Sequence, residues 1–124
     1  MNINLETPST ELFFISYKSG EIKTNKGLYE TSLIMSSQKI INSNWQPQTF
    51  EEINTKSFSE ILELDFEIIL LGTGENQKIP DNSTFKEFFK YGKSLDFMSS
   101  NAACRTFNIL ANEGRKVLAA IIVK

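Results

Sequence analysis

Two side chains near the C-terminus have the reactivity or charge that chemistry requires, Cys104 and Arg105. Cys104 is the only cysteine of the chain, and Arg105 is one of its two arginines. Both fall in the first turn of a predicted helix, where the positive end of the helix dipole can stabilise a thiolate. The competing interpretation is that Cys104 is a small buried hydrophobe, since free cysteine is among the most buried residue types. We favour burial, because helical spacing places Cys104 beside Phe107 and Ala111.

The composition excludes most catalytic and metal-binding arrangements. The chain contains no histidine, so triads with an imidazole base and histidine-ligated metals are ruled out. A lone cysteine cannot build a zinc or iron–sulfur site within one chain. Glu51 with Glu52, and Glu60 with Glu63, are close in sequence, but we interpret them as solvated charges because acidic side chains are mostly exposed. We therefore predict no catalytic residue, no metal and no cofactor.

A glycine-rich turn, Gly72-Thr73-Gly74, follows a predicted buried strand. It invites comparison with a dinucleotide-binding loop, whose glycines let the backbone approach a pyrophosphate at a helix N-terminus. However, the third glycine is missing, Glu75 stands where the anion would come, and Pro80 shows that no helix begins at once. We therefore interpret the segment as a strand-to-loop turn.

A crevice beside this turn remains an alternative, because ligands of open α/β sheets bind beyond the carboxyl ends of the strands. Free amides at the start of the C-terminal helix, together with Arg105, could hold a carboxylate or phosphate there. Cys104 would be the only credible nucleophile, and it lacks a histidine base. The candidate crevice residues are Gly72, Thr73, Gly74, Ser99, Ser100 and Cys104.

The side of the C-terminal helix opposite its core face is a candidate partner surface. Steps of 100° per residue bring four side chains together on that side. They are Arg105, Asn108, Ile109 and Asn112. An apolar side chain such as Ile109 gains little from water there, so the side meets solvent or a partner. The simpler alternative for Arg105 is a surface ion pair with Asp81 or Asp96, which would contribute about 0–1 kcal/mol.

The second half of the chain, about 55–123, alternates between helix and strand. Apolar residues spaced i, i+3, i+4 predict helices that start near residues 55 and 81. These stripes are Phe58, Ile61 and Leu62, and Phe85, Phe88 and Phe89. Continuous apolar stretches predict strands over 66–71, 95–98 and 117–123, of which 66–71 is expected at the centre of the sheet. The C-terminal helix is predicted over 101–113, between capping serines and Gly114.

The first half, about 10–46, is predicted to be β-rich. Candidate strands cover 12–17, 21–24, 28–35 and 39–44, with Ser19-Gly20 as a tight turn. Alternating elements favour a mixed or parallel sheet flanked by helices. The expected fold class is α/β, with a central mixed sheet flanked by helices and N-terminal strands that extend it or add a β-layer. A length of 124 residues supports one core, so we expect a single domain over 1–124.

Charge and hydropathy patterning narrow the class of partner. A formal charge of −2 and a pI near 5.2, with scattered lysines, leave no electrostatic footprint for nucleic acid. Apolar runs such as 68–71 are far too short to span a bilayer, so no transmembrane segment is expected. The first ten residues show neither a secretory signal nor a mitochondrial presequence. With a single cysteine, these features indicate a cytoplasmic protein.

The residues around Cys104 also resemble a known family. Residues 102–108 and 112–115, followed by an apolar final strand, are similar to small uncharacterised bacterial proteins related to mitochondrial complex I assembly factor three. The strand, Gly-x-Gly turn and Gln-x-x-Pro segment over 66–80 are similar to the same family. The resemblance implies a compact fold with a central mixed sheet and an added β-layer, and no established enzyme activity. Arg105 looks like a feature of the bacterial branch.

Two classes of function follow from the sequence. The favoured one is a non-enzymatic accessory protein that presents the helix side around Arg105 to an unidentified protein partner, such as a respiratory or other membrane complex. The mitochondrial relatives that the resemblance implies are assembly factors for the membrane-bound NADH:ubiquinone oxidoreductase. The alternative is a small-molecule (anion) binding protein or enzyme that uses the crevice. The first predicts an exposed apolar patch, and the second predicts a concave polar pocket with an accessible sulfur.

Overall fold

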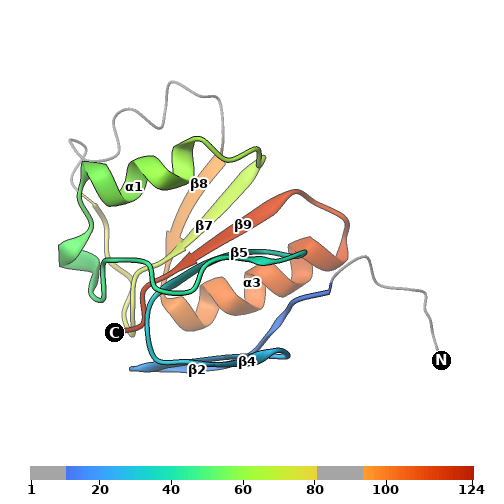
Figure 1. The fold of residues 1–124 in the computed structure, drawn as a ribbon, viewed down its shortest axis with the longest axis horizontal. Coiled ribbons are helices and arrows are strands. Elements are labelled where there is room, and N and C mark those ends of the chain that lie inside the picture. The colour runs from blue at the N-terminus through green and yellow to red at the C-terminus, as the bar shows by residue number, and fades with distance from the viewer. Residues whose placement is uncertain (1–10, 81–93) are drawn as a thin grey trace.

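A computed structural model describes residues 11–80 and 94–124. Within these residues the chain forms two β-sheets and helices that cover them (Figure 1). The predicted helix with the stripe of Phe85, Phe88 and Phe89 lies outside the described residues.

The larger sheet has five strands in the order β6-β5-β9-β7-β8. These are β6 (Ile40–Asn42), β5 (Leu33–Ser36), β9 (Val117–Ile121), β7 (Ile68–Gly72) and β8 (Ser94–Met98). β7 runs parallel to both β8 and β9, whereas β5 runs antiparallel to β9 and β6. The sheet is therefore mixed, as the alternation of helix and strand predicted.

The smaller sheet is the added N-terminal β-layer. It contains β2 (Phe14–Lys18), β3 (Glu21–Thr24) and β4 (Gly27–Tyr29), all antiparallel. It lies beside α3 (Ser100–Asn112), below the larger sheet in Figure 1. The sequence left open whether the N-terminal strands extend the large sheet or form a second layer. Both occur, since β5 and β6 extend the large sheet and β2 to β4 form a second layer.

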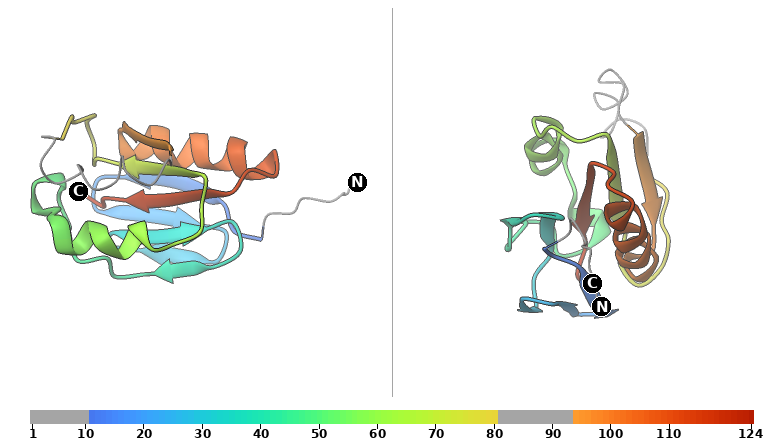
Figure 2. Two further views of the ribbon diagram at one scale, coloured as in Figure 1. Left: turned by 90° about the horizontal axis from the view of Figure 1, so that it is seen from above. Right: turned by 90° about the vertical axis from the view of Figure 1, so that its right-hand side faces the viewer.

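Helices cover the two faces of the large sheet. α1 (Thr55–Leu62) follows the short 3-10 helix η1 (Phe50–Glu52) and packs on one face, and α3 packs on the other (Figure 2). α1 begins where Asn54 and Ser57 cap each other, each side chain accepting from the other residue's backbone N–H. Such a reciprocal cap satisfies two amides that a helix start leaves unpaired.

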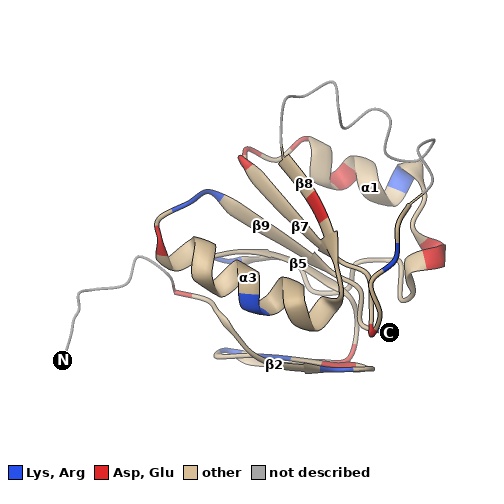
Figure 3. Cartoon of the chain, turned by 180° about the vertical axis from the view of Figure 1, so that it is seen from behind, with Lys and Arg blue, Asp and Glu red and all other residues tan. Residues whose placement is uncertain are grey.

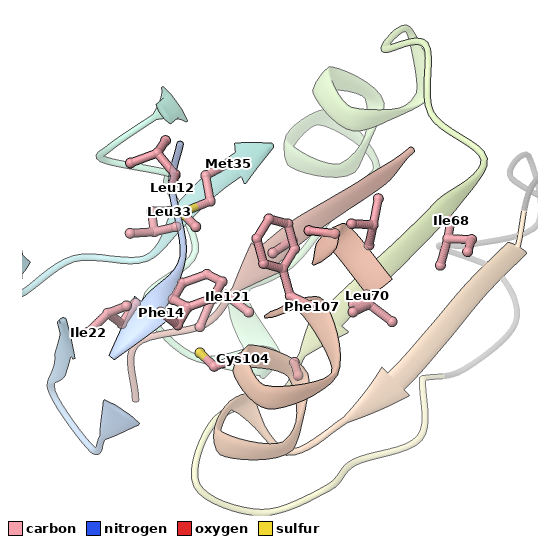
Figure 4. Close-up of a cluster of buried hydrophobic side chains, with 14 of the residues drawn as sticks. Leu12, Phe14, Ile22, Leu33, Met35, Ile68, Leu70, Cys104, Phe107 and Ile121 are labelled. Atoms are coloured by element: carbon pink, nitrogen blue, oxygen red, sulfur yellow. The ribbon is translucent and has the colours of Figure 1, made fainter. Parts of the chain in front are cut away.

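Alternation along the strands divides the core between the two faces, because successive strand residues point to opposite sides. On β9, Ala119 and Ile121 face α3 and the small sheet, whereas Leu118 and Ala120 face α1. The α3 side includes Leu12, Phe14, Ile22, Leu33, Met35, Ile68, Leu70, Cys104 and Phe107, as Figure 4 shows. The α1 side includes Ile34, Trp45, Phe58, Ile61, Ile69 and Leu71.

The α/β fold class with its mixed sheet, flanking helices and extra β-layer is confirmed, but two details were wrong. Residues 28–35 are not one strand: they split into β4 and β5, which belong to different sheets. Ser32 lies in the segment that connects β4 to β5. Its hydroxyl accepts a hydrogen bond from Val123 N (2.9 Å), which holds this segment against the end of the chain. The middle strand is β9 and not β7, although β7 is buried along its whole length.

Candidate functional site

The start of α3 and the end of β7 meet, as the crevice hypothesis required, but they meet in direct contact. The Ser100 hydroxyl is fully buried. It accepts a hydrogen bond from Gly74 N (2.9 Å) and donates one to Ile122 O (2.7 Å). A Cβ added at Gly72 would lie 2.8 Å from both Cα and Oγ of Ser100. The space between the turn and the helix is therefore filled by Ser100.

The other residues of the predicted crevice also have structural contacts. Ser99 caps α3 by accepting from Ala102 N (3.3 Å). The buried Thr73 hydroxyl donates to Asn76 O (2.6 Å) and accepts from Lys78 N (3.1 Å), which closes the turn after β7. These contacts use the polar atoms that would otherwise bind an anion. These residues lie close together, as the sequence predicted, but Ser100 fills the space between the two segments. The contact between residues 72–74 and residues 99–100 is here called the joint.

Cys104 is buried, with 3% of its surface exposed, as its helical position predicted. Its side chain lies within the cluster of Figure 4, on the α3 side of the sheet. Burial raises the pKa of this thiol to about 12, because a low-dielectric surrounding disfavours the thiolate. Desolvation thus outweighs any gain from the helix dipole. A thiol that is neutral and covered is a poor nucleophile at neutral pH.

Tyr17 is a second titratable group near this contact, beside Cys104. Its hydroxyl donates to Val123 O (3.0 Å) and ties the small sheet to the end of the large one. Partial burial is the main cause that raises the pKa of the phenol. Tyr17 therefore stays neutral and serves as a hydrogen-bond donor.

The predicted partner surface is exposed at three of its four positions. Arg105, Ile109 and Asn112 all face solvent on α3, and 60% of the Ile109 surface is exposed. In the described part of the chain, no carboxylate lies within ion-pair distance of Arg105, so the alternative pair with Asp96 is not formed. Asp81 lies outside the described residues. Arg105 is also the only charged residue of the 13-residue helix, whose surroundings Figure 3 shows.

Asn108 differs from the expectation, because its side chain is used within the fold. Its Oδ1 accepts from Phe14 N (2.9 Å), and its Nδ2 donates to Phe14 O (2.8 Å). The carboxamide therefore pairs with the backbone of β2 in the way a neighbouring strand would. Helical spacing predicted Asn108 on the solvent side, but the small sheet lies along that edge of α3. Asn108 holds the two elements together.

Sequence reasoning missed a second exposed apolar region, on the side of the small sheet that faces away from the core. Phe13, Ile15 and Leu28 are 42%, 54% and 52% exposed. The run of apolar residues over 12–15 could have indicated it. Successive strand residues point to opposite faces, so a run of consecutive apolar residues puts apolar side chains on both faces, and only one face packs against the core.

A polar hollow beside α1 was also not predicted. Its lining consists of Gln46, Asn54, Lys56, Ser57, Ser59 and Glu60. Asn54 and Ser57 satisfy each other in the helix cap, and Glu60 accepts from Asn42 Nδ2 (2.8 Å). Most polar groups of the hollow thus already have partners within the chain.

Neither a metal site nor a membrane-crossing helix is found in the described part of the chain. Within residues 11–80 and 94–124, no cluster of three or more acidic, cysteine or histidine side chains could hold a metal ion. In the same ranges, no helix combines the length and apolar character that crossing a membrane requires.

The structure is a small α/β domain. Ser100 fills the space where the crevice was expected, and the exposed side of α3 carries a single charged residue, Arg105. The fold matches a Mth938-like domain of Bordetella pertussis, with a TM-score of 0.80 at 20% identity over 99% of this chain and 92% of that chain. Residues 14–122 match the family described as "Protein of unknown function (DUF498/DUF598)". The chain belongs to this family, which confirms the resemblance found in the sequence.

The chain is also similar to three individual proteins. The "13 kDa major membrane protein" of Francisella tularensis is 36% identical over 98% of this chain and 99% of that protein. A solved Xanthomonas campestris protein is 30% identical over 99% of this chain and 92% of that chain, with a TM-score of 0.80. The Bos taurus "NADH dehydrogenase [ubiquinone] 1 alpha subcomplex assembly factor 3" is 31% identical over 63% of this chain and 44% of that protein. The chain thus spans less than half of that assembly factor.

Proposed function

We propose that this chain is a non-enzymatic accessory protein that binds a protein partner through the exposed side of α3 and acts at a membrane complex as an assembly factor. The binding surface consists of Arg105, Ile109 and Asn112. The assembly role is supported by similarity to proteins named as complex I assembly factors. Action at a membrane is supported by the relative named as a major membrane protein.

The observation that carries the proposal is the composition of the exposed helix side. Exposed helix sides usually carry many lysines and glutamates, but α3 carries one charge in 13 residues. Depletion of charge and enrichment of arginine are features of the centres of protein interfaces. The exposed side of α3 has both, and Arg105 has no ion-pair partner in the described part of the chain. The Arg105 guanidinium can grip a carboxylate or backbone carbonyls of a partner through two parallel hydrogen bonds.

The alternative, an anion-binding protein or enzyme at the crevice, receives less support. Ser100 occupies the space beside Gly72, and the sulfur of Cys104 is buried. The amide of Gly74 already donates to Ser100. A ligand there would have to displace a hydroxyl that has both of its hydrogen bonds.

The test is affinity purification of the tagged full chain from its native host, with identification of co-purifying proteins. We expect subunits of a membrane complex with the wild type, and their loss with Arg105→Lys or Ile109→Ser, because lysine cannot make the two-point contact. The melting temperature should stay nearly fixed. Arg115→Lys is the matched control, since Arg115 is also exposed and its closest carboxylate is Glu67 at 4.0 Å.

Equal recovery of the same subunits with Arg105→Lys, Ile109→Ser and the wild type would remove the support for this surface. Unfolding of both Arg105→Lys and Arg105→Ala would make Arg105 a structural residue.

A further inference from the structure

The side of the small sheet that faces away from the core is an exposed apolar surface with lysines among its apolar residues. Inward-facing residues of this sheet, such as Phe14 and Ile22, are buried in the core. The residues on the other side are here named the outer sheet face. They include Phe13, Ile15, Lys23 and Leu28, with Lys26 in the turn between β3 and β4, and all five are exposed.

The apolar part of this face is not explained by packing within the described chain. Five large hydrophobic side chains are exposed among the described residues, and three of them are Phe13, Ile15 and Leu28. They come from β4 and from the segment around the start of β2, where Phe13 and Ile15 flank the inward-facing Phe14 and therefore lie on the opposite side of the sheet. Gathered apolar side chains on a soluble surface mark an interaction site more often than scattered ones do.

The charges on the face are arranged around this apolar part. Lys23 lies in register with Leu28 on one side and Ser16 on the other. No carboxylate in the described ranges lies within ion-pair distance of Lys23 or Lys26. The carboxylates lie toward the ends: Glu21 pairs with Lys18 at 3.5 Å, Glu30 follows β4, and Glu11 precedes Phe13. The face therefore combines apolar side chains with two ammonium groups that have no ion-pair partner among the described residues, Lys23 on the middle strand β3 and Lys26 in the turn between β3 and β4.

The charges on this face disfavour a second copy of the chain as its occupant. In a two-fold contact the same patch meets itself, so the Lys23 and Lys26 of one copy would face a patch that carries the same two lysines. Like charges facing each other in an interface cost several kcal/mol. A lipid surface has no such conflict, since apolar side chains enter the headgroup boundary while lysines reach phosphate groups.

We propose that the outer sheet face docks on the headgroup region of an anionic lipid bilayer. Ile15, Leu28 and Phe13 insert, and Lys23 and Lys26 contact lipid phosphates. This inference rests on the proposed function, which brings the chain to a membrane.

The experiment is flotation of the purified full chain with vesicles of phosphatidylcholine alone and of phosphatidylcholine with phosphatidylglycerol. We expect binding to the anionic vesicles that weakens with salt. Ile15→Ser with Leu28→Ser, and separately Lys23→Gln with Lys26→Gln, should each reduce binding about tenfold or more. Ile109→Ser and Arg105→Lys are the controls, because they alter the α3 surface and should float like the wild type.

Flotation that is absent, or equal for the wild type and both double variants with unchanged melting temperatures, would overturn the proposal. If the double variants then also failed to capture partner subunits, the outer sheet face would be a protein-binding surface. The proposed function is tested separately, since it depends on Arg105 and Ile109. Retained capture by α3 without flotation would overturn the lipid contact alone.

Discussion

Asn108 and Phe14 are 94 residues apart in sequence and are joined by two hydrogen bonds between the Asn108 carboxamide and the backbone N–H and C=O of Phe14. The N–H of Phe14 donates to Oδ1 at 2.9 Å, and its carbonyl accepts from Nδ2 at 2.8 Å. The Phe14 ring packs edge-on against Phe107, one residue before Asn108, with centroids 5.2 Å apart. This contact attaches the small sheet to α3.

Asn108→Ala should lower the free energy of unfolding by about 1–3 kcal/mol, because it leaves a partly buried N–H and C=O of Phe14 without partners. Asn108→Asp keeps an acceptor for the N–H but loses the donor, so its loss should be comparable. The measurement is denaturant unfolding. Asn112→Ala is the control, since Asn112 is exposed on the same helix; an equal effect of the two alanine variants would contradict the role of the carboxamide.

Cys104 makes stability depend on pH in the alkaline range. Its pKa is raised from 9.0 to about 12 in the folded protein. The unfolded thiol therefore loses its proton first, so stability from this group is constant below about pH 9 and falls between pH 9 and 12. Cys104→Ala should be less stable than the wild type at pH 7, and the difference should shrink by pH 10. A constant difference across this range would show that the thiol is not desolvated.

The same burial predicts slow chemistry at the sulfur. Native protein should react with a thiol reagent at least about a hundredfold more slowly than protein unfolded in denaturant, because the reagent needs an exposed thiolate. Reaction at similar rates in both states would mean that the sulfur is accessible, and would revive the crevice alternative.

Ser100 and Gly72 should behave as a packed joint. Ser100→Ala should cost about 1–3 kcal/mol, since Gly74 N and Ile122 O lose their buried partner. Gly72→Ala should also destabilise, because the new Cβ would lie 2.8 Å from the Ser100 backbone. Adding Ser100→Ala to Gly72→Ala should not restore stability, since the clash with Cα remains. Thermal unfolding measures all three, and a Gly72→Ala variant as stable as the wild type would show that the joint is open.

Phe58 tests the other face of the large sheet. It is 1% exposed among Ile34, Trp45 and Ile61. Phe58→Ala should lower the free energy of unfolding by about 3–5 kcal/mol, through lost burial and the cavity left behind. Ile109→Ala, at an exposed position of α3, should change it by less than about 0.5 kcal/mol. If both variants melted alike, α1 would not cover the sheet as described.

Within the described residues, the amino-acid sequence by itself indicated most of the helices and strands and which sides of them are apolar. The i, i+3, i+4 stripe of Phe58, Ile61 and Leu62 predicted α1, and the spacing around Phe107 predicted the burial of Cys104. Both depend on local geometry, since side-chain direction repeats with a fixed period along one element. The family resemblance also lies in contiguous residues and is confirmed by the match over 14–122.

Only the tertiary structure decided what lies opposite each face. Helical periodicity places Asn108 toward solvent until the small sheet, far away in sequence, brings Phe14 beside it. The Gly72 and Ser100 segments look like two walls of a crevice until packing brings them into contact. The split of residues 28–35 between two sheets has the same origin, since long-range pairing with β3 and β9 decides which strand each part joins. Periodicity gives the direction of a side chain, whereas its partner depends on contacts between distant segments.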